Sequence, residues 1–296
     1  MVKRLFYLVG INIAILVTIN ILMFLAERFF GVSIAPDTYS GLIVFGIVFW
    51  FGGAFVNLLI SKWSAKRLYK IQLFDETIGN EKLKLVYRTV QEIAFNHKMT
   101  IPEVGVYESG EVNAFATWAS KNKSLVAVSS GLIQVMSPDE IQGVIGHEMT
   151  HILNGDMVTT TLLQGSLNAF TIIAARIVGG LIDGAINKNS DSSGGGIGYY
   201  IIVSVLNIIF GSLAGLILMA HSRSREYKAD EGGAKYTSKD KMLAWLHKLA
   251  QISGNPVPQD GFATMKFGGG SGLARLRSSH PPIEERIEAL ENNYSL

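Results

Sequence analysis

The distribution of apolar and polar residues divides this chain into membrane-length apolar stretches and two more polar blocks. Uncharged apolar stretches occupy about residues 5–26, 42–60 and 197–220. Each is close to the roughly 20 residues that a helix needs to cross the hydrocarbon of a bilayer. A further stretch, about 157–182, is apolar but contains Arg176 and several hydroxyl and amide side chains. It is either a fourth span or a helix buried in protein or lying at the interface, and the basic residues favour four spans.

These basic residues lie mostly on one side of the four stretches. They precede the first stretch and follow the second and the last, whereas the first intervening loop contains only Arg28 and the loop at 183–196 only Lys188. Because basic loops stay in the cytoplasm, we expect a multi-pass protein with cytoplasmic termini and 183–196 outside. The residues on the cytoplasmic side are Lys3, Arg4, Lys62, Lys66, Arg67, Lys70, Arg223, Arg225 and Lys228.

The spans separate two polar blocks, which we expect to form one cytoplasmic domain in two halves. The halves are residues 61–156 and 221–296, while 1–60 and the hairpin 157–220 form the membrane part. Apolar periodicity predicts helices in both halves and short strands in the first. The expected helices cover 80–97, 222–236, 240–252 and a segment from Pro281. The expected strands cover about 104–107, 114–117 and 125–129. The predicted fold class is therefore mainly α with a small β-sheet (α+β), attached to four membrane helices.

Composition supports a membrane protein and limits its chemistry. Hydrophobic residues make up 48% of the chain and charged residues 17%, which is too apolar for an ordinary soluble domain. The net charge of +2 gives no support for nucleic-acid binding. The chain has no cysteine, so any metal site must use histidine and carboxylate ligands.

One helix carries a metal-binding pattern. Ser137 and Glu140 form a capping box before an apolar stripe at helical spacing, so a helix is expected to begin there. His147 and His151 are one turn apart and can bind one metal ion, with Glu148 beside them to accept a proton from water. We expect a partly buried helix with the histidines at the edge of the stripe. The alternative is a surface helix whose two histidines share no ligand.

A third ligand is expected from the second polar block. A catalytic zinc needs three protein ligands and an open position. Glu226 and Asp230 are four residues apart on one helical face, so Glu226 could bind the metal while Asp230 hydrogen-bonds a ligand histidine. The alternative is a solvated helix face of mixed charge.

These motifs together resemble the HtpX-type membrane metalloproteases, which are gluzincins and bacterial relatives of the CAAX prenyl proteases. The motifs are H-E-x-x-H at 147–151, N-G-D at 154–156, E-x-x-x-D at 226–230, N-A-F-A at 113–116 and H-P-P with R-I at 280–287. They fall in the same order as in that family, and the resemblance covers almost the whole chain.

The resemblance implies a complete catalytic site. His147, His151 and Glu226 would hold one zinc ion per chain, and Asp230 would support a ligand histidine. Zinc would activate a water molecule, and Glu148 would accept its proton and deliver it to the leaving amine.

Two features of the catalytic site stay open. The donor to the oxyanion is expected to be His280, with Arg286 and Tyr227 as rivals. Alternatively, His280 is simply the residue before the N-terminus of a helix and has no catalytic role. Arg286 could likewise be a structural partner of Asp230.

A short segment in the first polar block is a candidate for substrate binding. Asn113, Ala114, Phe115 and Ala116 form either a substrate-binding edge strand or an ordinary strand of the sheet.

The sequence thus indicates an integral membrane zinc endopeptidase with its active site in the cytoplasm. The resemblance implies a bacterial cytoplasmic (inner) membrane protein that acts in stress-related quality control on misfolded or damaged membrane proteins. Its partners would be the lipid bilayer and polypeptide substrates. The alternatives are a CAAX-type processing protease, for which more spans are expected, and a non-catalytic membrane scaffold or chaperone with a structural zinc.

Overall fold

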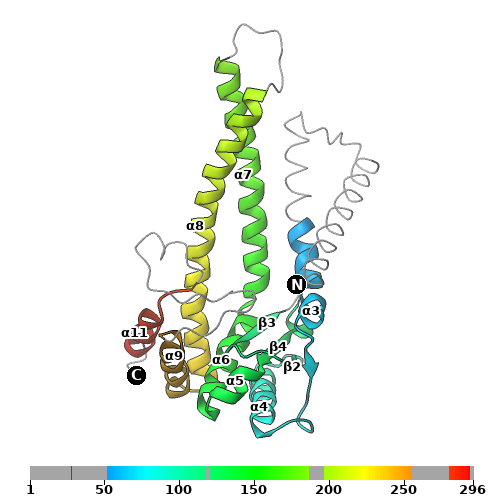
Figure 1. Cartoon of the computed structure of the whole chain (residues 1–296), viewed down its shortest axis with the longest axis vertical. Coiled ribbons are helices and arrows are strands. Elements are labelled where there is room, and N and C mark those ends of the chain that lie inside the picture. Colours follow the sequence, from blue (N-terminus) through cyan, green and yellow to red (C-terminus); the bar gives the residue numbers. More distant parts are fainter. Residues whose placement is uncertain (1–27, 29–51, 118–119, 187–196, 255–279, 294–296) are drawn as a thin grey trace. The chain divides into compact units, whose positions relative to one another are not determined.

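The structure is a computed structural model that describes residues 28, 52–117, 120–186, 197–254 and 280–293. The expected span at 5–26, the first part of the expected span at 42–60 and most of the loop at 183–196 lie outside the described residues. The helices are α3 (Gly52–Leu68), α4 (Glu81–Asn96), α5 (Ser130–Val135), α6 (Pro138–Asn154), α7 (Asp156–Ile186), α8 (Ile197–Tyr236), α9 (Lys239–Ser253) and α11 (Ile283–Asn293). The strands are β1 (Gln72–Leu73), β2 (Glu103–Tyr107), β3 (Ala114–Thr117) and β4 (Leu125–Ser129). The described part is therefore mainly helical with a small sheet, as the sequence predicts (Figure 1).

The chain forms two compact units. Among the described residues, 28, 52–57, 160–186 and 197–218 belong to the first unit and the others to the second, so α3, α7 and α8 each run from one unit into the other.

A four-stranded mixed sheet lies in the second unit, in the order β1-β2-β4-β3. β2 and β4 are parallel, with Val104 opposite Val126, and β3 pairs antiparallel with β4, with Ala114 opposite Val128. Strands β2, β3 and β4 match the expected strands closely, whereas β1 and α5 were not expected. β3 is an edge strand of this sheet and packs against α6.

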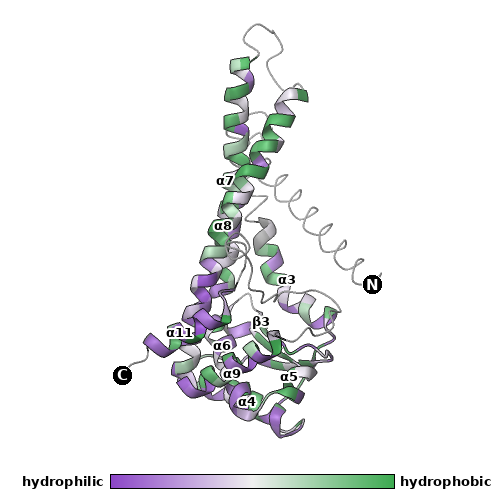
Figure 2. Cartoon of the chain, turned by 60° about the vertical axis from the view of Figure 1, so that its left-hand side comes forward, coloured by the Kyte–Doolittle hydropathy of each residue, from purple (hydrophilic) through white to green (hydrophobic). Residues whose placement is uncertain are grey.

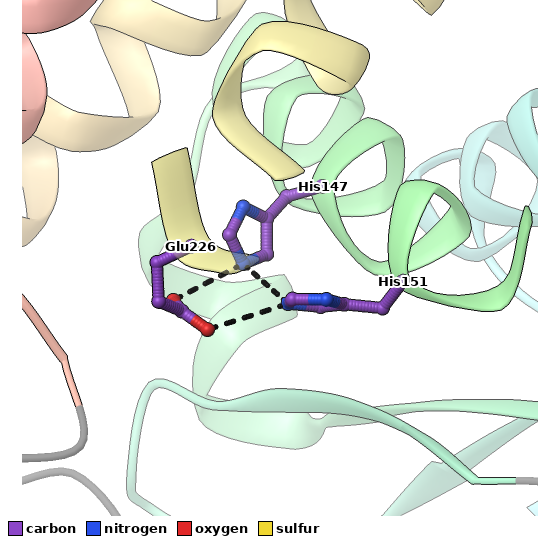
Figure 3. Close-up of side chains that lie close together, drawn as sticks. All are labelled: His147, His151 and Glu226. Carbon is purple, nitrogen blue, oxygen red and sulfur yellow. Dashed lines mark hydrogen bonds and ion pairs between the residues drawn. The ribbon is translucent and has the colours of Figure 1, made fainter. Parts of the chain in front are cut away.

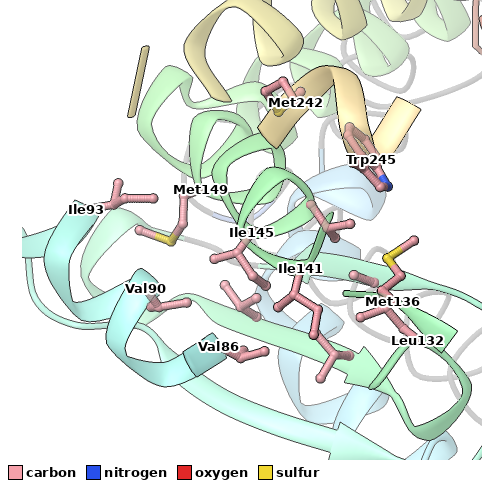
Figure 4. Close-up of a cluster of buried hydrophobic side chains, with 14 of the residues drawn as sticks. Val86, Val90, Ile93, Leu132, Met136, Ile141, Ile145, Met149, Met242 and Trp245 are labelled. Atoms are coloured by element: carbon pink, nitrogen blue, oxygen red, sulfur yellow. The ribbon is translucent and has the colours of Figure 1, made fainter. Parts of the chain in front are cut away.

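The core of this unit lies between one face of the sheet and the helices α4, α6 and α9 (Figure 4). α6 contributes fully buried apolar residues to both sides, so it is enclosed rather than laid on the surface. Burying a side chain of this size stabilises the fold by about 1.5–3 kcal/mol. The labelled core residues are Val86, Val90, Ile93, Leu132, Met136, Ile141, Ile145, Met149, Met242 and Trp245.

Glycines let the backbones of three helices touch. A Cβ atom placed on Gly146 would lie 3.1 Å from the carbonyl oxygen of Gly233, and one on Gly233 would lie 3.0 Å from the backbone nitrogen of His147. A Cβ on Gly143 would lie 2.5 Å from the carbonyl oxygen of Lys241. Because these helices approach so closely, α8 can bring its side chains directly over the histidines of α6.

Two described helices, α7 and α8, are long and apolar enough to cross a membrane. Only 22% and 6% of their most apolar windows are buried among the described residues, which leaves most of their apolar surface open. Figure 2 shows hydrophobic residues along the upper parts of both helices and hydrophilic residues at the lower end of α8. Gly179 lets Val203 of the neighbouring helix come close, as small residues do between membrane helices.

The structure corrects one expected boundary. A separate helix was expected over 222–236 after a span ending near Ala220, but α8 is one continuous helix of 40 residues. The change from apolar to polar side chains alters the solvent around the helix. It does not interrupt the backbone hydrogen bonds, because no glycine or proline stands between Ala220 and Glu226.

Candidate metal centre

The helix that carries the histidines is fixed at both ends by local interactions. Ser137 Oγ accepts from the backbone N–H of Glu140, and Glu140 Oε2 accepts from that of Ser137, so the expected capping box is present. At the other end Gly155 has a φ of 78°, a left-handed conformation that ends the helix. The five residues His147 to His151 therefore lie on regular helix, and the two imidazoles share one face.

Three side chains from two helices converge at one point (Figure 3). The Nε2 atoms of His147 and His151 are 3.1 Å apart. The carboxylate of Glu226 reaches both of them, with Oε2 3.6 Å from the first and Oε1 3.5 Å from the second. Ligands of a tetrahedral zinc ion at about 2.0–2.1 Å stand roughly 3.4 Å from one another. The spacing and chemistry of these three groups therefore fit a metal ion.

Each imidazole is held from behind by a carboxylate. His147 Nδ1 lies 2.9 Å from Asp230 Oδ1, and His151 Nδ1 lies 2.6 Å from Asp156 Oδ2. A carboxylate at Nδ1 keeps the proton on that nitrogen and leaves the Nε2 lone pair for a metal. Asp156 was not expected in this role, although it stands in the N-G-D segment that follows the helix.

Arg286 connects the two carboxylates of α8. Its Nε and Nη2 donate to Asp230 at 2.8 and 2.6 Å, and Nη1 lies 3.8 Å from Glu226 Oε2. The guanidinium is 1% exposed and lies over the ring of Trp245, 5.3 Å from its centroid. Arg286 thus has the geometry of a structural partner of Asp230.

The charges of the buried carboxylates are set by these neighbours. Burial would raise the pKa of Asp230, but Arg286 and His147 hold it below its ordinary value. Burial would likewise raise the pKa of Glu226, but hydrogen bonds from His147, His151 and His280 hold it well below its ordinary value. Glu226 is therefore ionised, which is the form that binds metals.

Glu148 differs from these carboxylates, because burial raises its pKa, with the two histidines opposing that effect. Burial here is greater than expected: Glu148 is 7% exposed and His147 3%. The prediction that the histidines lie at the edge of the stripe is wrong for His147, since α8 and α9 cover that side of α6 at its glycines. A raised pKa makes the Glu148 carboxylate a stronger base.

The expected substrate segment lies directly beside Glu148. β3 packs against α6, and the backbone of Ala116 opposes the effect of burial on the pKa of the Glu148 carboxyl group. Ala114, Phe115 and Ala116 belong to the edge strand β3, and Asn113 precedes it, held by backbone hydrogen bonds to Ser129. The edge of the sheet and the helix with the histidines therefore meet at this carboxylate.

Of the three expected oxyanion donors, His280 lies nearest the three converging groups. Its Nδ1 is 2.8 Å from Glu226 Oε2. Tyr227 instead donates to Glu285 at 3.3 Å, and Arg286 is engaged by Asp230. His280 is not part of the group of three that could hold a metal.

Comparisons with known proteins agree with this site. Residues 80–294 match the description "Peptidase family M48". A protein of Shewanella pealeana named Protease HtpX is 45% identical over 291 residues, which cover 97% of this chain and 99% of that protein. One of Stenotrophomonas maltophilia with the same name is 44% identical over 290 residues, covering 98% of each.

A solved structure has the same fold. The crystal structure of S. mikatae Ste24p has a TM-score of 0.66 at 20% identity, and the match covers 98% of this chain and 64% of that one. At this identity the likeness concerns the fold alone. The family match and the curated relatives are similar to this chain in sequence as well. The matched residues include the helix with the histidines and the carboxylates of α8. The chain is therefore a membrane metalloprotease and belongs to peptidase family M48.

Proposed function

We propose that this metalloprotease is a zinc endopeptidase in which His147, His151 and Glu226 hold one zinc ion. The observation that carries the proposal is the set of three ligand atoms 3.1–3.6 Å apart, with both Nδ1 atoms already bound to carboxylates. Two imidazoles and one carboxylate are a ligand set that catalytic zinc uses, and three protein ligands leave a position open.

Glu148 is the proposed general base. When bound, the metal supplies a Lewis acid that polarises the peptide carbonyl and makes water more acidic. Glu148 follows the ligand His147 directly, is 7% exposed, and has a raised pKa because of its burial. It accepts the proton of the attacking water and passes it to the nitrogen of the leaving amine. The packing of β3 against α6 places the backbone of Ala116 near this carboxylate.

Substrate is proposed to bind as an extended strand along β3. Among the strands that the structure describes, β3 is an edge strand, and the side away from β4 offers backbone groups for pairing. Asn113, whose backbone is held by Ser129, would fix the start of this edge, and main-chain hydrogen bonds to Ala114, Phe115 and Ala116 would place a peptide bond beside Glu148 with little demand on side-chain identity.

His280 is the proposed donor to the oxyanion. Its position beside Glu226 puts it next to the ligand atoms without making it one of them. If His280 acts on the oxyanion, His280→Ala lowers kcat by about 10²–10³-fold and leaves the zinc content unchanged. Loss of zinc in this variant would instead assign His280 to holding Glu226 in place.

The proposed cellular setting is the bacterial cytoplasmic (inner) membrane, crossed four times, with the termini and the site in the cytoplasm. It is supported by the two long apolar helices α7 and α8 and by the basic residues Arg223, Arg225 and Lys228 that follow the apolar stretch of α8. The proposed substrates are misfolded membrane proteins, because His151 is followed after five residues by the first residue of α7. Such a short connection favours polypeptides that are already near the bilayer.

The test compares Glu148→Gln with Glu92→Gln, an exposed carboxylate on α4 that contacts no part of the site. Both proteins should bind one zinc ion per chain. Glu148→Gln should cleave an unfolded polypeptide about 10²–10⁴-fold more slowly than the control. Full activity of Glu148→Gln would exclude it as the base, and wild-type protein that binds zinc without cleaving any peptide would favour the scaffold function.

A further inference from the structure

A cavity lies beside the metal centre, next to the Asp156 carboxylate that holds His151. It has a volume of about 560 Å³ and lies between the end of α6, the first turn of α7 and the stretch of α8 from His221 to Tyr236. Asp156, which holds His151 from behind, forms part of its wall. The cavity is large enough for a small polar ligand, since ligand sites measure about 300–1,000 Å³. We call it the basic cavity, after Arg225, Lys228 and Lys235.

These three cations are arranged along one face of α8. They contribute three positive charges to the wall, against the two carboxylates Asp156 and Glu231. Because Asp156 is already bound to His151 Nδ1, the cations dominate the charge that a ligand would meet.

Two nitrogen atoms in the wall also lack hydrogen-bond partners among the described residues, and one of them can only donate. His221 Nε2 and Arg225 Nε are buried and have no hydrogen-bond partner within the part of the chain that the structure describes. A guanidinium can only donate, so burying its Nε without an acceptor is unfavourable unless a ligand provides one. Oxygen atoms of an anion would satisfy this need.

The position along the chain indicates where that anion comes from. His221 follows directly on the apolar stretch of α8, and Thr159 lies in the first turn of α7, so the wall begins where both apolar stretches end. Phosphate groups of phospholipids lie at this depth of a bilayer, and basic pockets beside membrane helices bind anionic headgroups. Arginine and lysine are the side chains best suited to phosphate.

We propose that the basic cavity binds a phosphate group, supplied by an anionic phospholipid headgroup or by free phosphate. Arg225 and the two lysines neutralise the phosphate charge, and His221 lies at the bilayer end of the cavity. The lining of the basic cavity contains none of the three metal-binding side chains. Asp156 connects the two sites, because it lines the cavity and also holds His151.

The test uses the full-length protein in detergent and a titration with phosphatidylglycerol, followed by native mass spectrometry. The variant Lys228→Gln with Lys235→Gln removes two charges from the wall, and both side chains are exposed, so folding is not expected to suffer. The control, Lys123→Gln with Lys248→Gln, removes two charges outside the cavity. We expect the dissociation constant for phosphatidylglycerol to rise by about 30-fold in the cavity variant, about 5-fold per lysine, and to change little in the control.

Competition then identifies the source of the phosphate. If inorganic phosphate displaces phosphatidylglycerol from the wild-type protein, the site takes free phosphate as well. If it does not, and phosphatidylcholine binds more weakly, the site takes the anionic lipid. Equal binding by the wild-type protein and the cavity variant, or an equal loss in the control, would overturn the proposal.

Discussion

Replacing Arg286 with methionine tests the buried charge cluster behind the metal centre. The substitution keeps much of the side-chain volume but leaves the Asp230 carboxylate, which is 2% exposed, without its two hydrogen bonds from the guanidinium. Removing one partner of a buried pair costs about 3–5 kcal/mol, because the remaining charge is buried without compensation. For a chain of this size, that corresponds to a fall in melting temperature of about 10 °C.

A double variant separates lost charge pairing from lost packing. Asp230→Leu combined with Arg286→Met removes both charges, so most of the thermal stability should return. Its affinity for zinc should still fall by about 10–100-fold, because His147 Nδ1 loses its acceptor. Compared with the single variant, the double variant should therefore have a higher melting temperature but a lower affinity for zinc.

The matched control is Arg88→Met on α4, where the arginine pairs with Glu76 at 3.0 Å but both side chains are at least half exposed. Such a pair contributes about 0–1 kcal/mol. Melting temperatures are measured on the purified protein in detergent by intrinsic fluorescence. An Arg286→Met protein that melts at the same temperature as the Arg88→Met control would refute the argument from the buried charge.

Three further predictions concern other parts of the second unit. Asp156→Ala should weaken zinc binding about 10–100-fold, since His151 loses its partner at Nδ1. Competition with a chelator measures the affinity, and an unchanged affinity would contradict the role of Asp156. Gly232→Ala should destabilise the protein by about 1–3 kcal/mol because the new Cβ would lie 2.3 Å from a side chain of α6. In the control Gly211→Ala the new Cβ meets nothing within 4 Å, so the stability should not change. Equal melting temperatures of the two variants would argue against the close crossing of the helices. Burial would raise the pKa of Glu103, but two lysines of α3 lower it below 4.5, so its contribution to stability is present at neutral pH and disappears as the pH falls below that value. Glu103→Gln should therefore cost at most about 1 kcal/mol at pH 7 and progressively less as the pH falls through the lowered pKa, and a cost that does not change with pH excludes the ion pairs as its cause.

Features determined by neighbouring residues could be predicted from the sequence. The capping box of Ser137 and the strands β2 to β4 depend on local patterns, and all are present. The burial of His147 could not be predicted, because it depends on α8 and α9 crossing α6 at glycines, which leave no periodic signal. Asp156 was missed because only the turn at Gly155 brings its side chain back to the helix that it follows.

The unbroken course of α8 restricts how the metal centre can move. The helix rises about 1.5 Å per residue, so a slip of one residue along its axis would displace Glu226 by far more than the roughly 0.2 Å that a metal–ligand bond tolerates. The backbone contact of Gly146 with Gly233 fixes that axial register. An intramembrane displacement of α8 would therefore carry the Glu226 carboxylate away from the two histidines, so under the proposed function a peptide enters past the elements that border β3 rather than by movement of this helix.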